Sequence, residues 1–470
     1  MRIERVESGM RADAGATDAV EMHPRHRVGI LAALIALGLS AAFAVTAQHY
    51  AVSASERYLQ ALAGQAVPIK WESLTLQRAA YATGTTLPIY GSSELYCCGV
   101  PALPSQLFGA APTGFRTFPV GRAGTGDLFF MQTFAALGGD LRGKKLVISD
   151  SPGWFFGPQG IGDAAYAGNF SPEIAEAFAF DAPISMDLKE AGARLMIAHP
   201  ATLSDQPLLR LALDGLARPT ALHLARYYAL YPAGRLLSWV HQMQDAADTL
   251  SYIREHPALR ADASNGPSRI DWRTTLAAMT SLSRQRVTTN PFGFPDATYK
   301  RLAKTLGPAL ARFCAGTDDH NGTRMAYPSA WARSMSSSAE WTDLELELRV
   351  LNELGARPLV YSLPMPGTYD DFTQLSYPAR RAYYAKYASV ATAAGVPWLD
   401  FEEHDGDRYT LTDTGAHFSP RGWVLAGRAL DLFWQGASIS QIRSSLADLT
   451  REVPTPAAPP RARYCAGPKR

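Results

Sequence analysis

The residues in this chain best suited to chemistry are a serine and a distant histidine, each in a turn of small residues. Ser93 lies in GSSEL (91–95), directly after the strand-like run TLPIY. His417 lies in DTGAHF (413–418), four residues after Asp413. A turn after a strand exposes a hydroxyl, and a histidine oriented by a carboxylate can activate that hydroxyl as a nucleophile. The Ser–Asp–His order is one of several known for this triad, so the motifs predict acyl chemistry on a serine.

Each motif is also an ordinary turn when taken alone. Gly-Ser-Ser is a common turn tripeptide, and Asp-Thr-Gly is a common Asx-turn. Here both occur in one chain, the first after a strand-like run and the second before the helix-like WVLAG (423–427). This combination favours catalysis over two unrelated loops.

Composition places the chain among globular proteins and excludes several functions. Of its 470 residues 47% are hydrophobic and 19% are charged, which suits one large domain or two ordinary ones. The formal net charge is +2, so nothing argues for nucleic acid as a partner. No glycine-rich phosphate loop or dinucleotide fingerprint occurs, so we expect no cofactor. Asp318-Asp319-His320 has no supporting cluster of ligands, so we expect no metal site.

One segment near the N-terminus departs from a soluble composition. Val28–Ala47 is uncharged and long enough to span the roughly 30 Å hydrocarbon core as a helix. Basic residues at 25–27 precede it, whereas residues 48–55 carry no Lys or Arg, so the positive-inside rule predicts that residues 1–27 are a cytoplasmic tail. Small residues at 51–54 would suit cleavage of a signal peptide, but the long polar tail favours a retained anchor. We therefore expect a single-pass protein of the inner (cytoplasmic) membrane with a periplasmic or extracytoplasmic domain.

Export into an oxidising compartment makes the four cysteines candidates for disulfides. Cys97 and Cys98 closely follow Ser93, whereas Cys314 and Cys465 are far away in sequence. A bridge between adjacent cysteines is expected to be strained, so we expect one of the vicinal pair to bond Cys314 or Cys465. The connectivity itself does not follow from the sequence.

The elements that must position the candidate residues begin after the anchor. Residues 48–84 read as a helical connector, and short apolar strands are predicted at 86–90 and 146–149. Amphipathic spacing predicts that residues 185–310 are mostly helical. The last segment, 437–470, reads as a helix followed by a Pro-rich tail.

Strands and helices alternate again toward the C-terminus. A helix at 340–354 precedes an apolar strand at 358–363, and a helix at 379–394 precedes a strand at 397–401. Such repeats at both ends predict a three-layer α/β fold with a parallel sheet over residues 85–436, interrupted by the helical insert.

An ordered series of short motifs resembles the DltD family, the D-alanyl transfer proteins of the Gram-positive envelope and their Gram-negative relatives. The series covers roughly residues 85 to 435, and its most distinctive stretch is SPGWF (151–155). The other motifs, in order, are GSSE (91–94), GRAG (121–124), KKLVI (144–148), NFSP (169–172), EWTDL (340–344), LPMP (363–366) and HF (417–418). No single motif is specific, but the ordered set is.

The resemblance implies an SGNH-hydrolase-like fold, an α/β/α sandwich. It further implies that Ser93 is the nucleophile, His417 the general base and Asp413 the acid of a triad. The oxyanion hole would then be formed by the backbone N–H groups of Ser93 and Gly124.

Two departures from the family pattern leave alternatives open. Related enzymes place the aspartate three residues before the histidine, whereas Asp413 is four before His417. Asp405 or Asp407 could substitute, or a Ser–His dyad could work alone. Gly153 stands where relatives carry a polar residue, so the oxyanion hole could be built differently.

Two aromatic residues beside the site have two interpretations. Trp154 and Phe155 belong to the distinctive SPGWF stretch. Large aromatic side chains are more often part of a core, but next to the site they could line an acyl pocket.

The resemblance implies a membrane-anchored extracytoplasmic serine acyltransferase that esterifies an envelope glycopolymer with D-alanyl or another short acyl group. It also implies a membrane-bound O-acyltransferase partner like DltB, and a carrier protein that supplies the acyl donor in the cytoplasm. A periplasmic esterase that removes such groups is the alternative within the same chemistry. A non-catalytic partner of the acyltransferase is the alternative from a different class.

Overall fold

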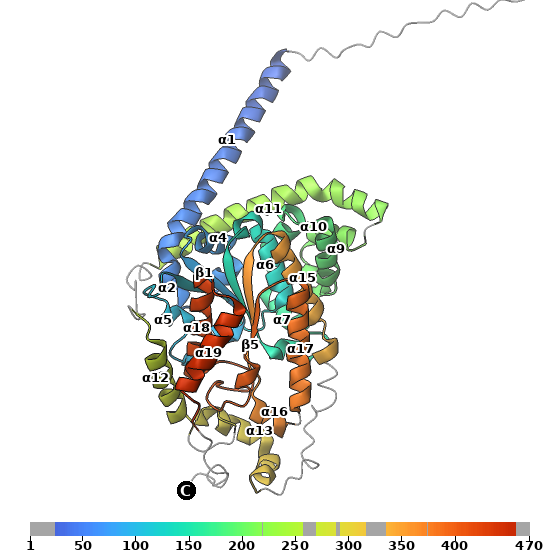
Figure 1. Ribbon diagram of the computed structural model, residues 1–470. Helices are drawn as coiled ribbons and strands as arrows, with labels where there is room; N and C mark the ends of the chain where they lie inside the picture. Colours follow the sequence, from blue (N-terminus) through green and yellow to red (C-terminus); the bar gives the residue numbers. More distant parts are fainter. Residues whose placement is uncertain are drawn as a thin grey trace, which may run out of the picture. The chain divides into compact units, whose positions relative to one another are not determined.

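In the described part of the chain, five parallel strands form one sheet (Figure 1). The computed structural model describes residues 24–218, 220–256, 269–287, 292–315, 335–373 and 375–456. The strands are β1 (Thr86–Gly91), β2 (Arg116–Gly121), β3 (Lys145–Asp150), β4 (Arg357–Ser362) and β5 (Trp398–Asp400). Their order in the sheet is β2-β1-β3-β4-β5, which confirms the predicted parallel α/β fold.

Alternate residues of the strands point into two separate hydrophobic cores, one on each face of the sheet. Leu146 and Ile148 of β3 belong to one core, and Val147 between them belongs to the other. The first core is completed by α4 (Leu74–Ala82), α6 (Asp127–Leu137), α15 (Glu340–Glu353) and α17 (Tyr377–Ala393), and the second by α12 (Trp272–Gln285), α18 (Pro420–Gln435) and α19 (Ile439–Glu452). Helices cover both faces, which explains the apolar strands and confirms the three-layer architecture.

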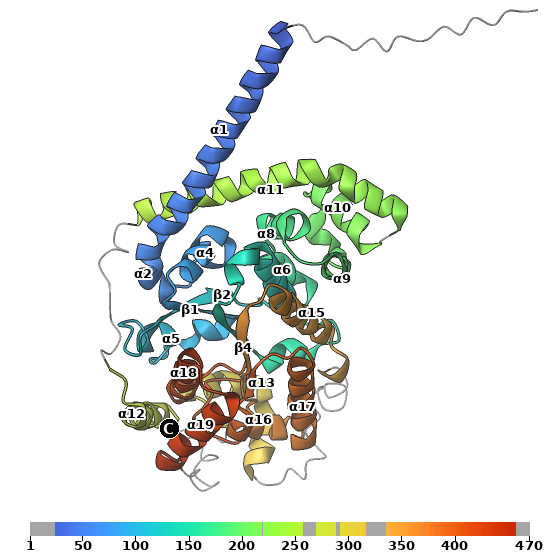
Figure 2. The ribbon, with the colours of Figure 1, turned by 45° about the horizontal axis from the view of Figure 1, so that its top comes forward.

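Further helices extend the layer that contains α4 and α6. Among them, α11 (Ala221–Glu255) runs across α4, α8 (Pro172–Glu176) and α10 (Pro207–Ala217) (Figure 2). Asp245 of α11 accepts a hydrogen bond at 2.8 Å from the N–H of Thr75, one of the N–H groups that the first turn of α4 leaves unpaired. The insert is thereby fastened to the helix that precedes β1. The remaining helices are α2 (Leu59–Ala63), α3 (Ile69–Glu72), α5 (Pro104–Leu107), α7 (Asp163–Asn169), α8 (Pro172–Glu176), α9 (Met186–Ile197), α10 (Pro207–Ala217), α11 (Ala221–Glu255), α13 (Asp296–Ala315) and α16 (Gly367–Phe372).

The first helix, α1 (Pro24–Ser55), contains the predicted anchor. The helical stretch Val28–Ala63 is the one span in the described residues that is long and apolar enough to cross a membrane. Only 6% of its most apolar window is buried, as expected for a segment that does not pack into a core. The chain divides into two compact units, Met1–Ala47 and Gln48–Arg470, and the finer domain boundaries stay predictions.

The edge strand β2 is not expected from the sequence. Its residues RTFPVG include Pro119, which has no N–H for a sheet ladder and argues against a strand. In the structure β2 is at the edge of the sheet, next to β1. An edge strand tolerates a proline because half of its N–H groups face away from the sheet.

The ends of β1 and β2 approach more closely than any side chain would permit. Gly121 pairs with Gly91, and a Cβ added to Gly121 would lie 1.9 Å from the carbonyl oxygen of Gly91. We expect Gly121→Ala to destabilise the protein by about 1–3 kcal/mol, as overpacking does, because the backbone must move. Thermal unfolding of the full chain measures the loss. At Gly406 an added Cβ meets nothing within 4 Å, so Gly406→Ala is the matched control. Equal unfolding midpoints for the two variants would contradict the prediction.

Candidate active site

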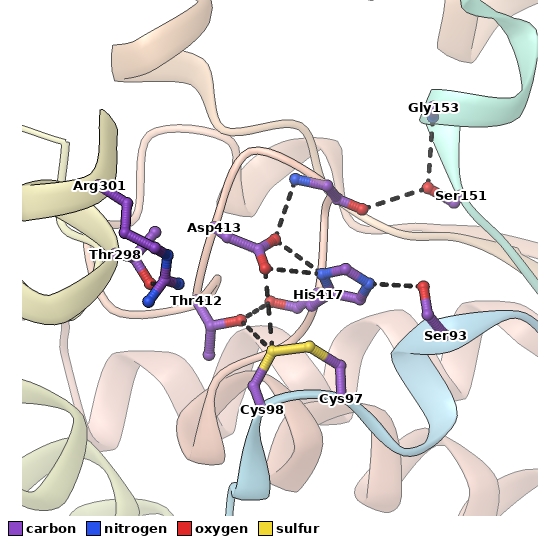
Figure 3. Close-up of polar contacts among 11 residues, drawn as sticks. Ser93, Cys97, Cys98, Ser151, Gly153, Thr298, Arg301, Thr412, Asp413 and His417 are labelled. Carbon is purple, nitrogen blue, oxygen red and sulfur yellow. Dashed lines mark hydrogen bonds and ion pairs between the residues drawn. A yellow bond between two sulfur atoms is a disulfide. The ribbon is translucent and has the colours of Figure 1, made fainter. Parts of the chain in front are cut away.

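The side chains of Ser93, His417 and Asp413 form one hydrogen-bonded relay (Figure 3). Ser93 Oγ lies 2.8 Å from His417 Nε2, and His417 Nδ1 lies 2.8 Å from each carboxylate oxygen of Asp413. A carboxylate can only accept, so Nδ1 carries the hydrogen and Nε2 is left to accept from the serine hydroxyl. This is the tautomer that a general base beside a serine requires.

The serine lies where the strand order of the sheet reverses. The chain passes from β1 to β2 on one side and then to β3 on the other side of β1. In open parallel sheets, ligands bind at the carboxyl ends of the strands beside such a switch point. Ser92 and Ser93 follow the last residue of β1 directly, so the fold delivers the hydroxyl to this position.

The turn that presents Ser93 is fixed by its two neighbours. Glu94 Oε1 accepts a hydrogen bond from the Ser92 N–H at 2.7 Å, and Ser92 Oγ accepts one from the Gly124 N–H at 3.0 Å. The side chains of Ser92 and Glu94 are both buried. They are positioning residues that the sequence analysis did not identify, although both belong to the GSSE motif.

A short antiparallel bridge brings the acid and the base together. Leu411 and Phe418 form an isolated β-bridge, and the chain between them turns back on itself. Within this turn the Gly415 N–H donates to Asp413 Oδ1 at 2.9 Å, which orients the carboxylate toward His417. The turn therefore brings Asp413 and His417 together across their four-residue spacing. Side chains four residues apart can also meet on one face of a helix, but these two do not use that arrangement.

The two alternative carboxylates have other partners. Asp405 accepts a hydrogen bond from the Tyr384 hydroxyl at 2.6 Å. Asp407 lies 2.9 Å from Nδ1 of His404. Of the three candidates, only Asp413 contacts His417 among the described residues.

Burial and charge act on His417 in opposite directions. Burial lowers the pKa of the imidazole, but the hydrogen bond and the charge of Asp413, with a smaller contribution from the charge of Glu94, raise it more. The net pKa of His417 is raised above its usual value. Burial also raises the pKa of Glu94, against the opposing effect of the Ser92 N–H bond. The site thus favours an imidazolium once His417 has accepted a proton.

The cysteines pair differently from the expectation. Cys97 and Cys98 form a vicinal disulfide with each other, which corrects the predicted link to a distant cysteine. The intervening turn accommodates this because Cys98 adopts a left-handed conformation, with φ of 75°. Cys465 and the side chain of Cys314 lie outside the described residues, as does the loop at 318–322.

The disulfide lies against the relay. Cys98 Sγ is 3.8 Å from Asp413 Oδ2 and 3.6 Å from the hydroxyl of Thr412 (Figure 3). Ligand atoms of Cys97, Cys98, Asp413 and His417 lie within 4.8 Å of one another. Metals bind cysteine as the thiolate, and the sulfurs of a disulfide are not thiolates. The disulfide therefore does not make this cluster a metal site, and its role here is to pack beside Asp413.

The two predicted oxyanion donors differ in their present partners. The Ser93 N–H has no acceptor among the described residues, whereas the Gly124 N–H donates to Ser92 Oγ. Gly124 has φ of 78°, a conformation that glycine adopts without strain. The Ser93 N–H is thus free for a substrate oxygen, and the role of Gly124 stays a prediction.

Trp154 and Phe155 lie in the hydrophobic core. Trp154 packs against Phe130, and Phe155 packs against Trp341 at a ring distance of 4.1 Å. Phe155 is fully buried and Trp154 is 7% exposed. Their contacts agree with the packing interpretation, and the acyl-pocket role stays a prediction.

The raised pKa of His417 gives the site a predictable pH dependence. A general base must be neutral, so reaction of Ser93 with a fluorophosphonate should decline as pH falls through the raised pKa of His417. We expect Asp413→Asn to slow this reaction by about 10²–10⁴-fold and to shift the decline to lower pH, because the group that raises the pKa is gone.

The rate of labelling measured against pH tests this expectation. Asp407→Asn is the matched control, since Asp407 contacts His404. An unchanged pH profile in Asp413→Asn would contradict the assigned relay.

Comparison with known proteins places this chain in a family. Residues 66–435, which include every residue of the relay, match the family model described as "DltD protein". The chain is 27% identical over 373 residues to "Protein DltD" of Bacillus subtilis (strain 168), with 79% of this chain and 88% of the relative covered. It is 23% identical over 351 residues to "Protein DltD" of Staphylococcus aureus (strain NCTC 8325 / PS 47), with 74% and 81% covered. The chain belongs to the DltD family.

Proposed function

We propose that this protein is a membrane-anchored extracytoplasmic serine acyltransferase that transfers D-alanyl or another short acyl group onto a cell-envelope glycopolymer. The DltD family takes part in D-alanylation of teichoic acids. The single observation that supports the chemistry is the relay from Ser93 Oγ through His417 to Asp413, with 2.8 Å at each step. A serine with a purely structural role would not require a histidine that is itself oriented by a carboxylate, so the relay favours an activated nucleophile.

The first half-reaction forms an acyl-serine. Ser93 Oγ attacks the carbonyl carbon of the donor while His417 Nε2 takes its proton, and Asp413 stabilises the imidazolium that results. The Ser93 N–H is available to bind the oxyanion. When the tetrahedral intermediate collapses, the bond to the donor breaks and His417 returns the proton to the leaving group. An ester on Ser93 remains.

The second half-reaction runs in the opposite sense. A hydroxyl of the acceptor polymer gives its proton to His417 Nε2 and attacks the ester carbon. The bond to Ser93 Oγ then breaks, and His417 returns the proton to the serine. The acyl group ends as an ester on the polymer and the enzyme is restored.

The topology of the proposal follows from the apolar segment. Helix α1 would cross the inner membrane with the basic residues at 25–27 in the cytoplasm, so that Gln48 and everything after it is exported. The acyl group arises in the cytoplasm on a carrier protein, so a membrane-bound O-acyltransferase like DltB has to pass it across. Such a partner supplies the donor to Ser93.

A serine-directed probe tests the nucleophile. We expect a fluorophosphonate to label the full chain in membranes, and labelling to be lost in Ser93→Ala and in His417→Ala. Ser251→Ala and His256→Ala, at the end of α11, are the matched controls and should label normally. Labelled peptide mapping should identify Ser93 itself.

The products separate the proposed transferase from its alternatives. Cells with Ser93→Ala should lose ester-linked acyl groups from their envelope polymer, measured after mild alkaline release. An esterase would leave more of these groups when Ser93 is replaced, and it would hydrolyse simple aryl esters unaided. Unchanged esterification with Ser93→Ala would overturn the catalytic proposal and favour a non-catalytic partner.

A further inference from the structure

The unit Gln48–Arg470 contains a cavity that is lined by none of the relay residues. It has a volume of about 550 Å³ and is lined by residues of α1, α4, α11 and the segment between α6 and β3. Among the lining residues are Gln48 and His49, which follow the apolar run directly, and three basic residues, Arg78, Arg142 and Lys144. Its size falls in the range of ordinary small-ligand sites, roughly 300–1,000 Å³.

Positive charge exceeds negative charge around this cavity. Asp140 is the one carboxylate among its lining residues, and it pairs with Arg78 at 3.1 Å. Lys144 Nζ donates to the backbone carbonyl of Tyr81 at 2.9 Å and contacts no carboxylate in the described residues. Arg142 has no ion pair within the described part of the chain and is exposed. Two cationic side chains are therefore left for an anionic ligand.

One of the cations is held in place by the protein. Arg78 donates to Gln242 of α11 at 3.3 Å in addition to its contact with Asp140. Arg78 is on α4, so the cavity wall is built where α11 is fastened to α4. A fixed guanidinium beside two available cations is suited to phosphate, which arginine and lysine bind through charge-assisted hydrogen bonds.

The sequence places one side of this cavity directly after the predicted membrane span. The apolar run ends at Ala47, and the lining residues Gln48, His49 and Val52 follow it within the same helix. At 1.5 Å per residue, Val52 lies about 8 Å beyond the end of the run. That is the depth of the lipid headgroups, given the anchor assumed in the proposed function. The α1 residues that line the cavity thus lie at the depth where phosphates of the outer leaflet are found.

We propose that this cavity binds the phosphate-bearing headgroup of an anionic phospholipid, such as phosphatidylglycerol, next to the anchor. Arg142 and Lys144 contact the phosphate, and Arg78 forms the fixed wall behind it. Val52 and Ala82 give the cavity an apolar side on which the start of an acyl chain can lie. Binding there fixes the orientation of the exported unit relative to the membrane, which a single helix does not do.

Lipid retention by the full chain tests the proposal. The protein is placed in nanodiscs of phosphatidylcholine with 30% phosphatidylglycerol, extracted into mild detergent, and examined by native mass spectrometry for bound lipid. We expect phosphatidylglycerol to be enriched at least tenfold over its share of the bilayer. In the double variant Arg142→Gln/Lys144→Gln, the enrichment of bound phosphatidylglycerol should be at least fivefold lower than in the wild type. Lys304→Gln/Arg349→Gln removes the same charges from exposed positions elsewhere and should retain it.

Competition identifies the source of the phosphate. Inorganic phosphate at 10 mM should leave the bound phosphatidylglycerol in place, because a lipid also uses the apolar side. Displacement by inorganic phosphate would mean a free-phosphate site and overturn the lipid assignment. Equal retention of phosphatidylcholine and phosphatidylglycerol would also overturn the lipid assignment. Retention of phosphatidylglycerol by Arg142→Gln/Lys144→Gln at the wild-type level would overturn it too.

Serine labelling in the same samples keeps the two proposals apart. The double variant should react with the fluorophosphonate as the wild type does, because neither residue touches the relay. Loss of lipid with normal labelling supports the lipid site whether or not the transferase assignment is right. Loss of both in the double variant would point to misfolding, and the single variants Arg142→Gln and Lys144→Gln would then decide, since the lipid site requires each to lower retention with labelling intact.

Discussion

The close approach of β1 and β2 at their carboxyl ends governs where Ser93 can lie. Gly91 and Gly121 pair with no room for a side chain on Gly121, so the loops that follow the two strands start side by side. This permits the Gly124 N–H to reach Ser92 Oγ only three residues after β2 ends. The turn of Ser93 and the loop of Gly124 therefore fix each other. A displacement of either strand would move the serine away from His417.

The relay depends on a balance between burial and charge. His417 is partly buried, which disfavours its protonated form, yet Asp413 beside it favours that form more. Asp413 itself is oriented by the Gly415 N–H on one oxygen and faces the disulfide with the other. A sulfur pair donates no hydrogen bond, so it leaves the negative charge of that oxygen directed at the imidazole. The unexpected vicinal disulfide thus completes the surroundings of the acid without competing for it.

Parts of this structure follow from local patterns in the sequence and parts do not. The apolar runs of β1, β3, β4 and β5 are visible because helices cover both faces of the sheet. The strand β2 is hidden by Pro119, whose effect depends on the edge position that only the assembled sheet defines. The contact between Ser93 and His417 was predictable because each is in a recognisable turn.

Other features of the site depend on contacts that sequence spacing does not reveal. The choice of Asp413 over Asp405 and Asp407 rests on the bridge between Leu411 and Phe418, which involves one backbone pair. The pairing of Cys97 with Cys98 depends on a left-handed backbone at Cys98, which a non-glycine residue seldom adopts. Both outcomes are settled by local backbone geometry that the sequence alone does not show.

The two contacts of the relay differ in the chain entropy that is lost when they form, because the bridge between Leu411 and Phe418 closes only a short loop. Asp413 and His417 meet by closing a loop of a few residues, which costs little chain entropy, although Leu411 and Phe418 of the bridge are themselves packed in the second core. Ser93 and His417 are 324 residues apart, and their contact exists only once the whole sheet has formed. The Asp413–His417 pair is therefore close in sequence, whereas the contact between Ser93 and His417 reports the integrity of the sheet. The distance between Ser93 and His417 is in this sense a built-in check that the domain after the apolar helix has folded.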